Sequence, residues 1–186
     1  MTRMTGRDGT PIIGIAGWKK SVKTTLTVRL VAEFVRRGFR VATVKHAHHD
    51  FQIDDAETDS ARHRRAGSGQ VAIVSRKRWA VVTERPDARE PDFADVIGWL
   101  DPCDLIVVEG YKSAPIPKIE ARRRASVTHT PMAEADPLII AIAADHPVGG
   151  ERIPVFSLDD VEAIADLIVA AVGPLGPARK TGPPFE

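Results

Sequence analysis

The chain has 186 residues, 43% of them hydrophobic and 27% charged, and a formal net charge of +1. This composition is typical of one soluble globular domain, and the near-neutral charge gives no reason to expect nucleic acid or a membrane as partner. No apolar run approaches the ~20 residues of a membrane span. Cys103 is the one cysteine, which excludes an internal disulfide and indicates a reducing compartment. We therefore expect a cytoplasmic protein.

Apolar runs alternate with amphipathic segments, and this alternation predicts an α/β fold with a mainly parallel sheet. We interpret as strands the runs at 11–16, 39–45, 70–75, 79–83, 104–109, 116–121, 138–143 and 154–156. Helices are expected at 24–37, at 59–66, after Pro91, and before Gly173. Residues 1–10 are predicted to be a flexible leader, 11–173 one domain, and 174–186 a disordered tail rich in Pro and Gly.

The loop between the first predicted strand and the first helix nearly fits the phosphate-binding pattern G-x-x-x-x-G-K-[ST]. Gly17, Lys23 and Thr24 occupy their places in it. In such a loop, backbone N–H groups and the helix N-terminus surround phosphates, the lysine reaches the β- and γ-phosphates, and the hydroxyl holds Mg²⁺. The pattern predicts a three-layer P-loop NTPase fold with helices on both faces of the sheet.

One position departs from this pattern, because Val22 stands where the lysine should be preceded by glycine. A β-branched residue resists a positive φ and places methyl groups where the backbone should approach phosphate. We therefore expect the loop to form but to bind a triphosphate poorly.

Polar residues of interest follow three predicted strands, in loops at 17–25, 45–59 and 109–112. In a parallel sheet these loops face the same edge, where ligands bind. Glu109 ends an apolar run, and P-loop enzymes commonly place there a carboxylate that supports Mg²⁺. The alternative is a strand followed by an ordinary polar turn.

A histidine-rich segment lies in the second of these loops. His46 and His48 lie two residues apart, so on a strand both imidazoles would point to one side and could bind a metal, with His49 and Asp50 next to them. No pair of cysteines supports a metal site. The alternatives are a polar loop that faces phosphate or a pterin, and a merely polar strand end.

Several of these segments together resemble the family of molybdopterin-guanine dinucleotide biosynthesis protein B (MobB). The similarity runs from about residue 12 to residue 167. It is carried by the segments KHAHHDF at 45–51, DSARHRRAG at 59–67, GIAGWKKS at 14–21, RWA at 78–80, VEGYK at 108–112 and PKIE at 117–120. The histidine-rich segment is the most specific of them.

The resemblance implies a GTP-binding P-loop protein with weak GTPase activity. It implies a homodimer that assists the guanylyltransferase MobA, which attaches GMP to molybdopterin. Residues implied to hold the phosphates are Gly17, Trp18, Lys19, Lys20, Ser21, Val22, Lys23, Thr24 and Thr25. Candidate ligands of Mg²⁺ are Thr24, Glu109, Asp59 and Asp50, and the catalytic candidates are Lys23, Asp59 and Glu109.

Two further groups of residues receive roles by the same resemblance. Asp145 follows a late strand and could read the N1–H and N2–H₂ groups of guanine. Lys45, His48, Arg62 and Arg64 could bind a second anion, either a substrate phosphate or the pterin of bound molybdopterin or its guanine dinucleotide.

Three functions from different classes follow from these residues. The first is a GTPase that assists cofactor guanylylation, and the second is a non-enzymatic adaptor that binds cofactor or partner proteins. Val22 favours the second more than a complete P-loop would. The third is a metallochaperone GTPase, motivated by His46, His48 and His49.

Overall fold

The structure is a computed structural model of the chain, and it describes residues 4–6, 9–47, 58–85, 89–126 and 130–176. The chain forms two compact units, which are considered separately. The larger unit comprises Met1–His46 and Phe93–Glu186, and the smaller unit comprises Ala47–Asp92. The domain predicted for residues 11–173 therefore contains two compact units.

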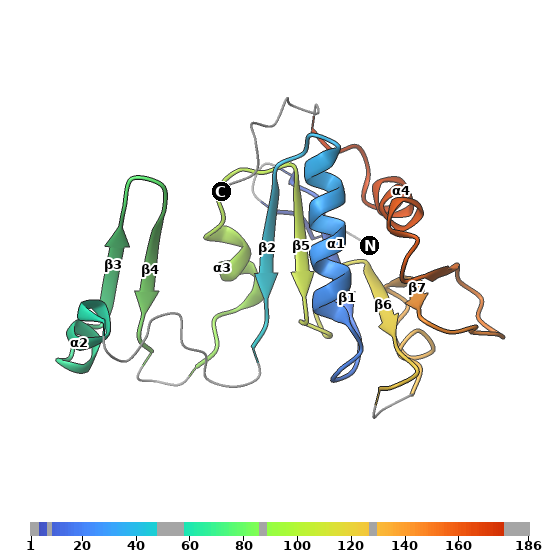
Figure 1. Cartoon of the computed structure of the whole chain (residues 1–186), viewed down its shortest axis with the longest axis horizontal. Helices are drawn as coiled ribbons and strands as arrows, with labels where there is room; N and C mark the ends of the chain where they lie inside the picture. The colour runs from blue at the N-terminus through green and yellow to red at the C-terminus, as the bar shows by residue number, and fades with distance from the viewer. Residues whose placement is uncertain (1–3, 7–8, 48–57, 86–88, 127–129, 177–186) are drawn as a thin grey trace. The chain divides into compact units, whose positions relative to one another are not determined.

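A six-stranded sheet in the order β2-β5-β1-β6-β7-β8 forms the centre of the larger unit, and all its neighbouring strands are parallel (Figure 1). Its strands are β1 (Ile12–Ala16), β2 (Val41–Lys45), β5 (Leu105–Glu109), β6 (Lys118–Arg122), β7 (Ile139–Ala144) and β8 (Val155–Ser157). The helices of this unit are α1 (Lys23–Arg36), α3 (Phe93–Gly98) and α4 (Val161–Val172).

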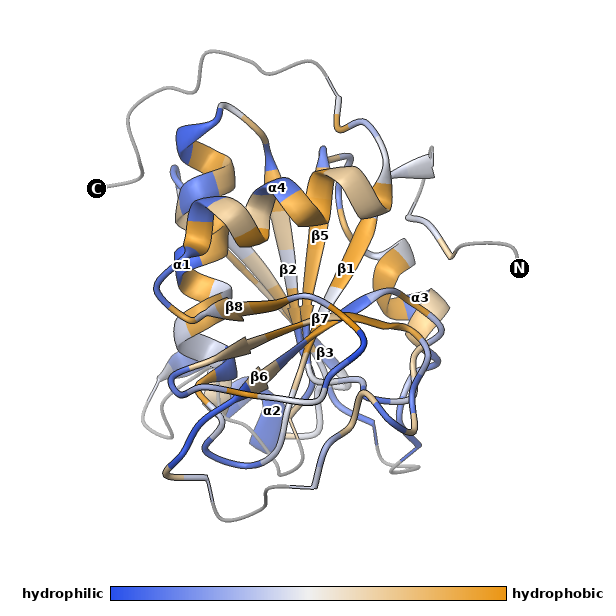
Figure 2. Cartoon of the chain, turned by 90° about the vertical axis from the view of Figure 1, so that its right-hand side faces the viewer, coloured by the Kyte–Doolittle hydropathy of each residue, from blue (hydrophilic) through white to orange (hydrophobic). Residues whose placement is uncertain are grey.

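Successive residues of the central strands face opposite sides of the sheet and enter two separate cores. Ile13 and Ile15 pack with α1 and α4 in the first cluster, whereas Ile12 packs with Ile97 of α3 in the second. Strands buried on both faces explain the continuous apolar runs in the sequence, and the central strands and the inner helix faces are apolar in Figure 2. The predicted three-layer α/β fold with helices on both faces is confirmed.

The smaller unit contains α2 (Asp59–Arg65) and an antiparallel pair of strands, β3 (Gln70–Val74) and β4 (Trp79–Thr83). Thr58 caps α2, because its hydroxyl accepts the N–H of Ala61 at 3.3 Å. Both strands were expected from their sequences, but they form a sheet of their own rather than joining the parallel one.

The ends of the chain differ from the predicted boundaries. Met4, inside the predicted leader, packs against the second core cluster. Leu175, inside the predicted disordered tail, packs against the first cluster. Both contacts add apolar burial to the larger unit. Residues 177–186 of that tail lie outside the described residues.

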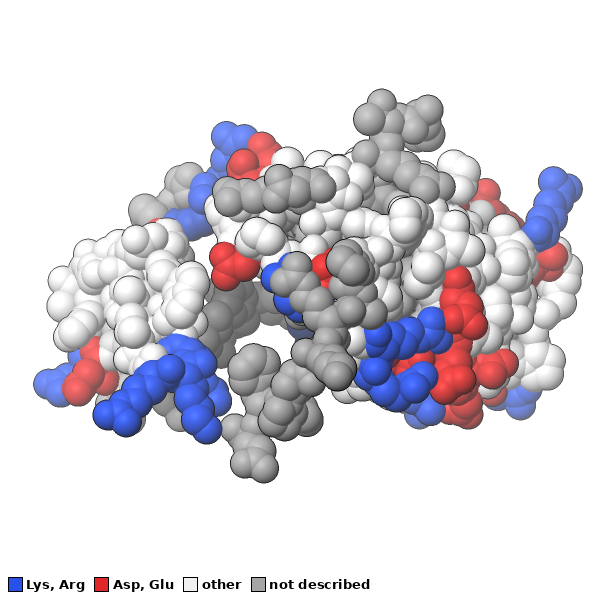
Figure 3. Space-filling model, turned by 90° about the horizontal axis from the view of Figure 1, so that it is seen from above, with Lys and Arg blue, Asp and Glu red and all other residues white. Residues whose placement is uncertain are grey.

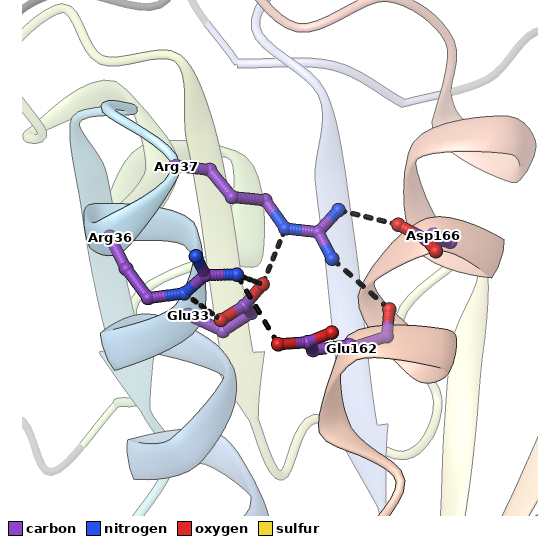
Figure 4. A network of polar contacts seen from close by, with 5 residues as sticks. All are labelled: Glu33, Arg36, Arg37, Glu162 and Asp166. Carbon is purple, nitrogen blue, oxygen red and sulfur yellow. Dashed lines mark hydrogen bonds and ion pairs between the residues drawn. The ribbon is translucent and has the colours of Figure 1, made fainter.

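A charged network joins α1 to α4 (Figure 4). Glu33 is buried and accepts hydrogen bonds from Arg36 at 2.7 Å and from Arg37 at 2.6 Å. Arg37 also donates to Asp166 of α4 at 2.6 Å. Similar mixed groups of basic and acidic side chains lie on the surface seen in Figure 3. The hydrogen bonds from Arg36 and then Arg37 outweigh burial and lower the pKa of Glu33 to about 2.

This network predicts a pH-dependent contribution to stability. A carboxyl whose folded pKa is lowered from 4.5 to about 2 stabilises the protein above pH 4.5, and that contribution disappears as the pH falls towards 2. We expect Glu33→Gln to lower the free energy of unfolding by about 2 kcal/mol at pH 7. The deficit relative to the unsubstituted chain should shrink between pH 4.5 and 2. Urea denaturation at several pH values measures both quantities.

The matched control is Glu162→Gln, which removes an exposed carboxylate 3.4 Å from the same Arg36. An exposed pair contributes little, so this variant should change the free energy of unfolding by less than about 1 kcal/mol. A deficit for Glu33→Gln that stays constant from pH 7 to pH 2 would contradict the assigned pKa.

Candidate functional site

Three loops meet at the carboxyl edge of the parallel sheet. Register sets this arrangement, because Glu109 at the end of β5 pairs with Ile15 of β1 on one side and with Lys45 of β2 on the other. The N–H of His46 donates to the carbonyl of Glu109 at 2.9 Å, and the N–H of Gly110 donates to the carbonyl of Ile15 at 3.2 Å. The expectation that the three loops share one edge is confirmed for the first and third loops and, in the second loop, for Lys45 and His46.

The loop from Gly17 to Thr24 folds back over its own lysine. Lys23 Nζ donates to the carbonyls of Gly17 at 3.0 Å and Trp18 at 2.8 Å. Gly17 has φ of 153°, and a Cβ there would lie 2.3 Å from Ser21 Oγ and 2.7 Å from the carbonyl oxygen of Ala121. Only glycine fits between these atoms, so this position has the close backbone approach that the pattern requires.

Val22 occupies the N-cap of α1 in the left-handed conformation, with φ of 61° and ψ of 20°. This is the conformation for which the pattern uses glycine, and it is unusual for a β-branched residue. Its side chain makes no capping hydrogen bond. The loop therefore keeps the backbone path of a phosphate-binding loop at the cost of local strain.

Glu109 and Thr24 form the contact on which the site depends. The Thr24 hydroxyl donates to Glu109 Oε1 at 2.7 Å, and Lys45 Nζ lies 3.9 Å from the same oxygen. Glu109 is buried, whereas Lys45 is exposed. A carboxylate and a hydroxyl at this distance present the oxygen ligands that Mg²⁺ prefers.

Lysine ammonium groups outnumber carboxylates here. Burial lowers the pKa of Lys23, the nearby Lys112 lowers it further, Glu109 acts in the opposite direction, and Lys45 lowers it again. These three lysines and one glutamate leave an excess of positive charge beside the loop. A polyanion that carries a bound cation would offset this excess, because its net charge is negative.

A buried hydroxyl in the loop gives a second test of whether the site suits a polyanion. Ser21 is 2% exposed, and its Oγ has no hydrogen-bond partner among the described residues. An unsatisfied buried polar group costs about 1–3 kcal/mol. A ligand with acceptor oxygens would satisfy it, so the loop suits a nucleoside triphosphate with Mg²⁺ better than an apolar ligand.

A pocket of about 150 Å³ adjoins the loop. Trp18 and Ser21 line one side, and residues at the ends of β6 and β7, such as Arg122 and His146, line the other. Asp145, the predicted guanine reader, directly precedes His146 but is not among the lining residues. Its Oδ1 accepts the Arg124 N–H at 2.8 Å and lies 2.8 Å from His146 Nδ1. The contact with His146 is the main cause that lowers the pKa of Asp145.

Glu120 is a residue of this region that the sequence analysis missed. This buried carboxylate of β6 accepts the N–H groups of Met132 and Ala133, each at 3.0 Å. The neighbouring Thr130 accepts the indole N–H of Trp18 at 2.7 Å. A charged residue inside a central strand is the signal in the sequence, because such a side chain needs partners to be buried.

Lys112 lies in the predicted loop at 109–112, but the sequence assigned it no role of its own. Its Nζ lies 3.9 Å from the centroid of the Trp18 ring. Burial lowers the pKa of its ammonium group. The other loop lysines, Lys19 and Lys20, are exposed, as is Thr25.

The remaining predicted site residues belong to the smaller unit or lie outside the described residues. Asp59, Arg62 and Arg64 belong to the smaller unit, where Asp59 pairs with Arg62 at 3.4 Å and Arg64 pairs with Glu84 at 3.0 Å. His48, His49 and Asp50 lie outside the described residues. Among the residues that are described, no group of three His, Cys, Asp or Glu side chains is arranged to hold a metal ion.

Comparison with known proteins gives consistent matches along the chain. Residues 12–145 match the family model described as "Molybdopterin guanine dinucleotide synthesis protein B". The chain is 37% identical over 158 residues to the molybdopterin-guanine dinucleotide biosynthesis adapter protein of Haemophilus influenzae, covering 85% of this chain and 87% of the relative. It is 35% identical over 168 residues to the protein of that name from Escherichia coli, covering 89% and 95%.

Solved structures agree with these matches. The crystal structure of a MobB protein homolog from Bacillus stearothermophilus has a TM-score of 0.64 at 29% identity, covering 87% of this chain and 97% of that one. A crystal structure of molybdopterin-guanine biosynthesis protein B has a TM-score of 0.65 at 28% identity, covering 86% and 99%. Within the described residues, no helix is long and apolar enough to cross a membrane.

The conformation of Val22 predicts that Val22→Gly stabilises the fold. Left-handed strain costs about 1–3 kcal/mol, and glycine is also the better N-cap. Glycine also raises the conformational entropy of the unfolded chain, and this reduces the gain in stability by about 0.5–1 kcal/mol. We expect the free energy of unfolding, measured in urea, to rise by about 1 kcal/mol.

The control is Val28→Gly, which changes an exposed residue with a right-handed backbone within α1 and should destabilise the protein instead. A loss of stability in both variants would contradict the strain assigned to Val22.

Proposed function

The chain belongs to the family of molybdopterin guanine dinucleotide synthesis protein B, and from this we propose that it is an adapter protein of molybdopterin guanine dinucleotide biosynthesis that binds GTP with Mg²⁺. The observation that carries the proposal is the 2.7 Å contact between the Thr24 hydroxyl and Glu109, next to a loop that surrounds Lys23. It brings the two halves of a nucleotide–metal site together from positions 85 residues apart in the chain.

The residues present suit a nucleotide as follows. Lys23 exchanges its loop carbonyls for the β- and γ-phosphate oxygens. Thr24 and Glu109 supply oxygen ligands for Mg²⁺, which neutralises phosphate charge when bound. The pocket beside Trp18 and Ser21 is the place for the base, and Asp145 at its border is the candidate for reading guanine.

Weak hydrolysis is consistent with this site. Phosphoryl transfer depends on positioning and on electrostatic stabilisation of the phosphates. Val22 places two methyl groups at the position where the pattern brings backbone closest to phosphate. The second candidate function, an adaptor that does not hydrolyse GTP, is favoured by this same residue.

The proposed partners are a second copy of this chain and the guanylyltransferase MobA. The β3–β4 hairpin offers a surface for the second copy. Val74 and Trp79 form a cross-strand pair and share one face with Val81, and these side chains are 77%, 67% and 46% exposed. An exposed apolar face on a two-stranded sheet is typical of an interaction site.

Calorimetric titration with GTP and ATP in the presence of Mg²⁺ tests the nucleotide site. We expect Val22→Gly to bind GTP in preference to ATP and to bind it at least about tenfold more tightly than the unsubstituted chain, since removal of about 1.4 kcal/mol of obstruction by the Val22 methyl groups corresponds to that factor. Turnover of GTP by the Val22→Gly variant then separates the GTPase from the non-hydrolysing adaptor. Equal affinity for GTP in both chains would contradict the assigned role of Val22, and binding by neither would overturn the nucleotide site.

Sedimentation analysis tests the proposed partners. The chain alone should sediment as a dimer and should form a larger complex with purified MobA. Trp79→Glu should shift the chain towards the monomer, because it places a charge on the exposed apolar face. Trp99→Glu changes a similarly exposed tryptophan, 66% against 67%, directly after α3 and should leave the dimer intact. Dissociation by neither or by both variants would show that the hairpin is not the interface.

A further inference from the structure

Lys112 is a half-buried cation with an unusual environment. It follows Glu109 by three residues, and its Nζ lies 3.9 Å from the centroid of the Trp18 ring. Within the described part of the chain, its ammonium group has no hydrogen bond or ion pair, and the ring is its one polar contact. The Nζ atom is not among the fully buried polar atoms that lack a partner, so the ammonium group is partly solvated and open to an anionic ligand.

A second lysine lies close enough to be affected. Burial is the largest cause that lowers the pKa of Lys23, and the positive charge of Lys112 is the next largest. Two ammonium groups that oppose each other's charge destabilise the empty loop, and a polyanion between them would reverse that effect. Lys23 donates hydrogen bonds to the carbonyls of Gly17 and Trp18, whereas Lys112 donates none to any described residue and is the more free to move.

The turn that carries Lys112 is held firmly. Gly110 has φ of 93° and Tyr111 has φ of 44°, a left-handed value that is rare for an aromatic residue. The Tyr111 ring stacks on His46 with centroids 4.5 Å apart and contacts Phe93 at 4.9 Å. Surroundings of this kind can maintain a strained backbone, so the backbone of Lys112 is fixed at the sheet edge while its side chain can change partner.

We propose that Lys112 binds the terminal phosphate of the bound triphosphate and leaves the face of Trp18 when it does so. This inference rests on the proposed nucleotide site. Thr24 and Glu109 mark the place of Mg²⁺, and in P-loop proteins that ion bridges β- and γ-phosphate oxygens. The turn with Lys112 begins at Glu109 and so lies at that end of the phosphate chain. A charge-assisted contact with phosphate is stronger than an ammonium group over a ring.

A diphosphate should leave Lys112 on Trp18. The pair would then distinguish the two nucleotide states, because only the triphosphate carries the oxygens that compete for the ammonium group. The indole ring would report the change directly, since it loses a cation from its face. Trp18 and Lys112 therefore form a sensor of the terminal phosphate rather than a general anion site.

The test is calorimetric titration of GTP and of GDP, each with Mg²⁺, into the full chain and into Val22→Gly. In the full chain and in Val22→Gly alike, adding Lys112→Gln should weaken the binding of GTP by about tenfold and the binding of GDP by less than about twofold. This is the loss expected for one charge-assisted contact. Lys112→Arg should retain most of the GTP affinity because it keeps the charge. Lys77→Gln, an exposed lysine of the smaller unit, is the matched control and should change neither affinity.

Tryptophan emission gives a readout that a structural role of Lys112 would not change. GTP should alter the emission of the chain and GDP should not, and both Trp18→Phe and Lys112→Gln should abolish the response. The thermal midpoint of Lys112→Gln should be no lower than that of the unsubstituted chain, which shows that the variant is folded.

Two results would overturn the inference in distinguishable ways. If GTP binds but Lys112→Gln lowers the affinities for GTP and GDP equally, or lowers neither affinity, then Lys112 does not recognise the terminal phosphate. The proposed nucleotide site would stand in that case. If neither the chain nor Val22→Gly binds GTP, the nucleotide site itself is wrong and the role of Lys112 falls with it.

Discussion

The register of three parallel strands is the constraint on which the rest of the site depends. Because Glu109 pairs with Ile15 on one side and Lys45 on the other, the carboxylate, the loop that follows β1 and the end of β2 must meet at one edge. The hydrogen bond between Thr24 and Glu109 is a consequence of this register. The two apolar cores that cover the sheet therefore hold the site geometry as much as the loop residues do.

Buried charges on β6 hold the other side of the loop. The Lys118 ammonium group pairs with Asp136 at 2.9 Å, and Glu120 binds the backbone that leads to Thr130, the acceptor of the Trp18 indole. The apolar cores supply most of the burial, while these pairs set the direction in which the segment after β6 runs. Buried charges contribute more to specificity than to stability when they act in this way.

The sequence predicted the strands, the order of the loops and the carboxylate at the end of β5, because each depends on local pattern. It did not predict the contact of Lys112 with Trp18, because this contact joins loops far apart in the chain and has no local pattern. The role of Glu120 had a signal, a charged residue inside a buried strand, but the pattern does not name its backbone partners. Nor did alternation show that 70–83 forms a separate sheet, since strand periodicity does not specify the partner strand. The left-handed backbone at Val22 was predictable because a positive φ is one of the two reasons for which the pattern uses glycine at that position.

Val22 also has a consequence for how this protein can change over generations. Codons for valine and glycine differ by a single base, and the backbone at position 22 already follows the path that glycine would take. A lineage can therefore acquire or lose the glycine of the phosphate-binding pattern in one mutational step, without rebuilding the strand, the helix or the carboxylate opposite. Residue 22 can then change while the rest of the scaffold stays the same.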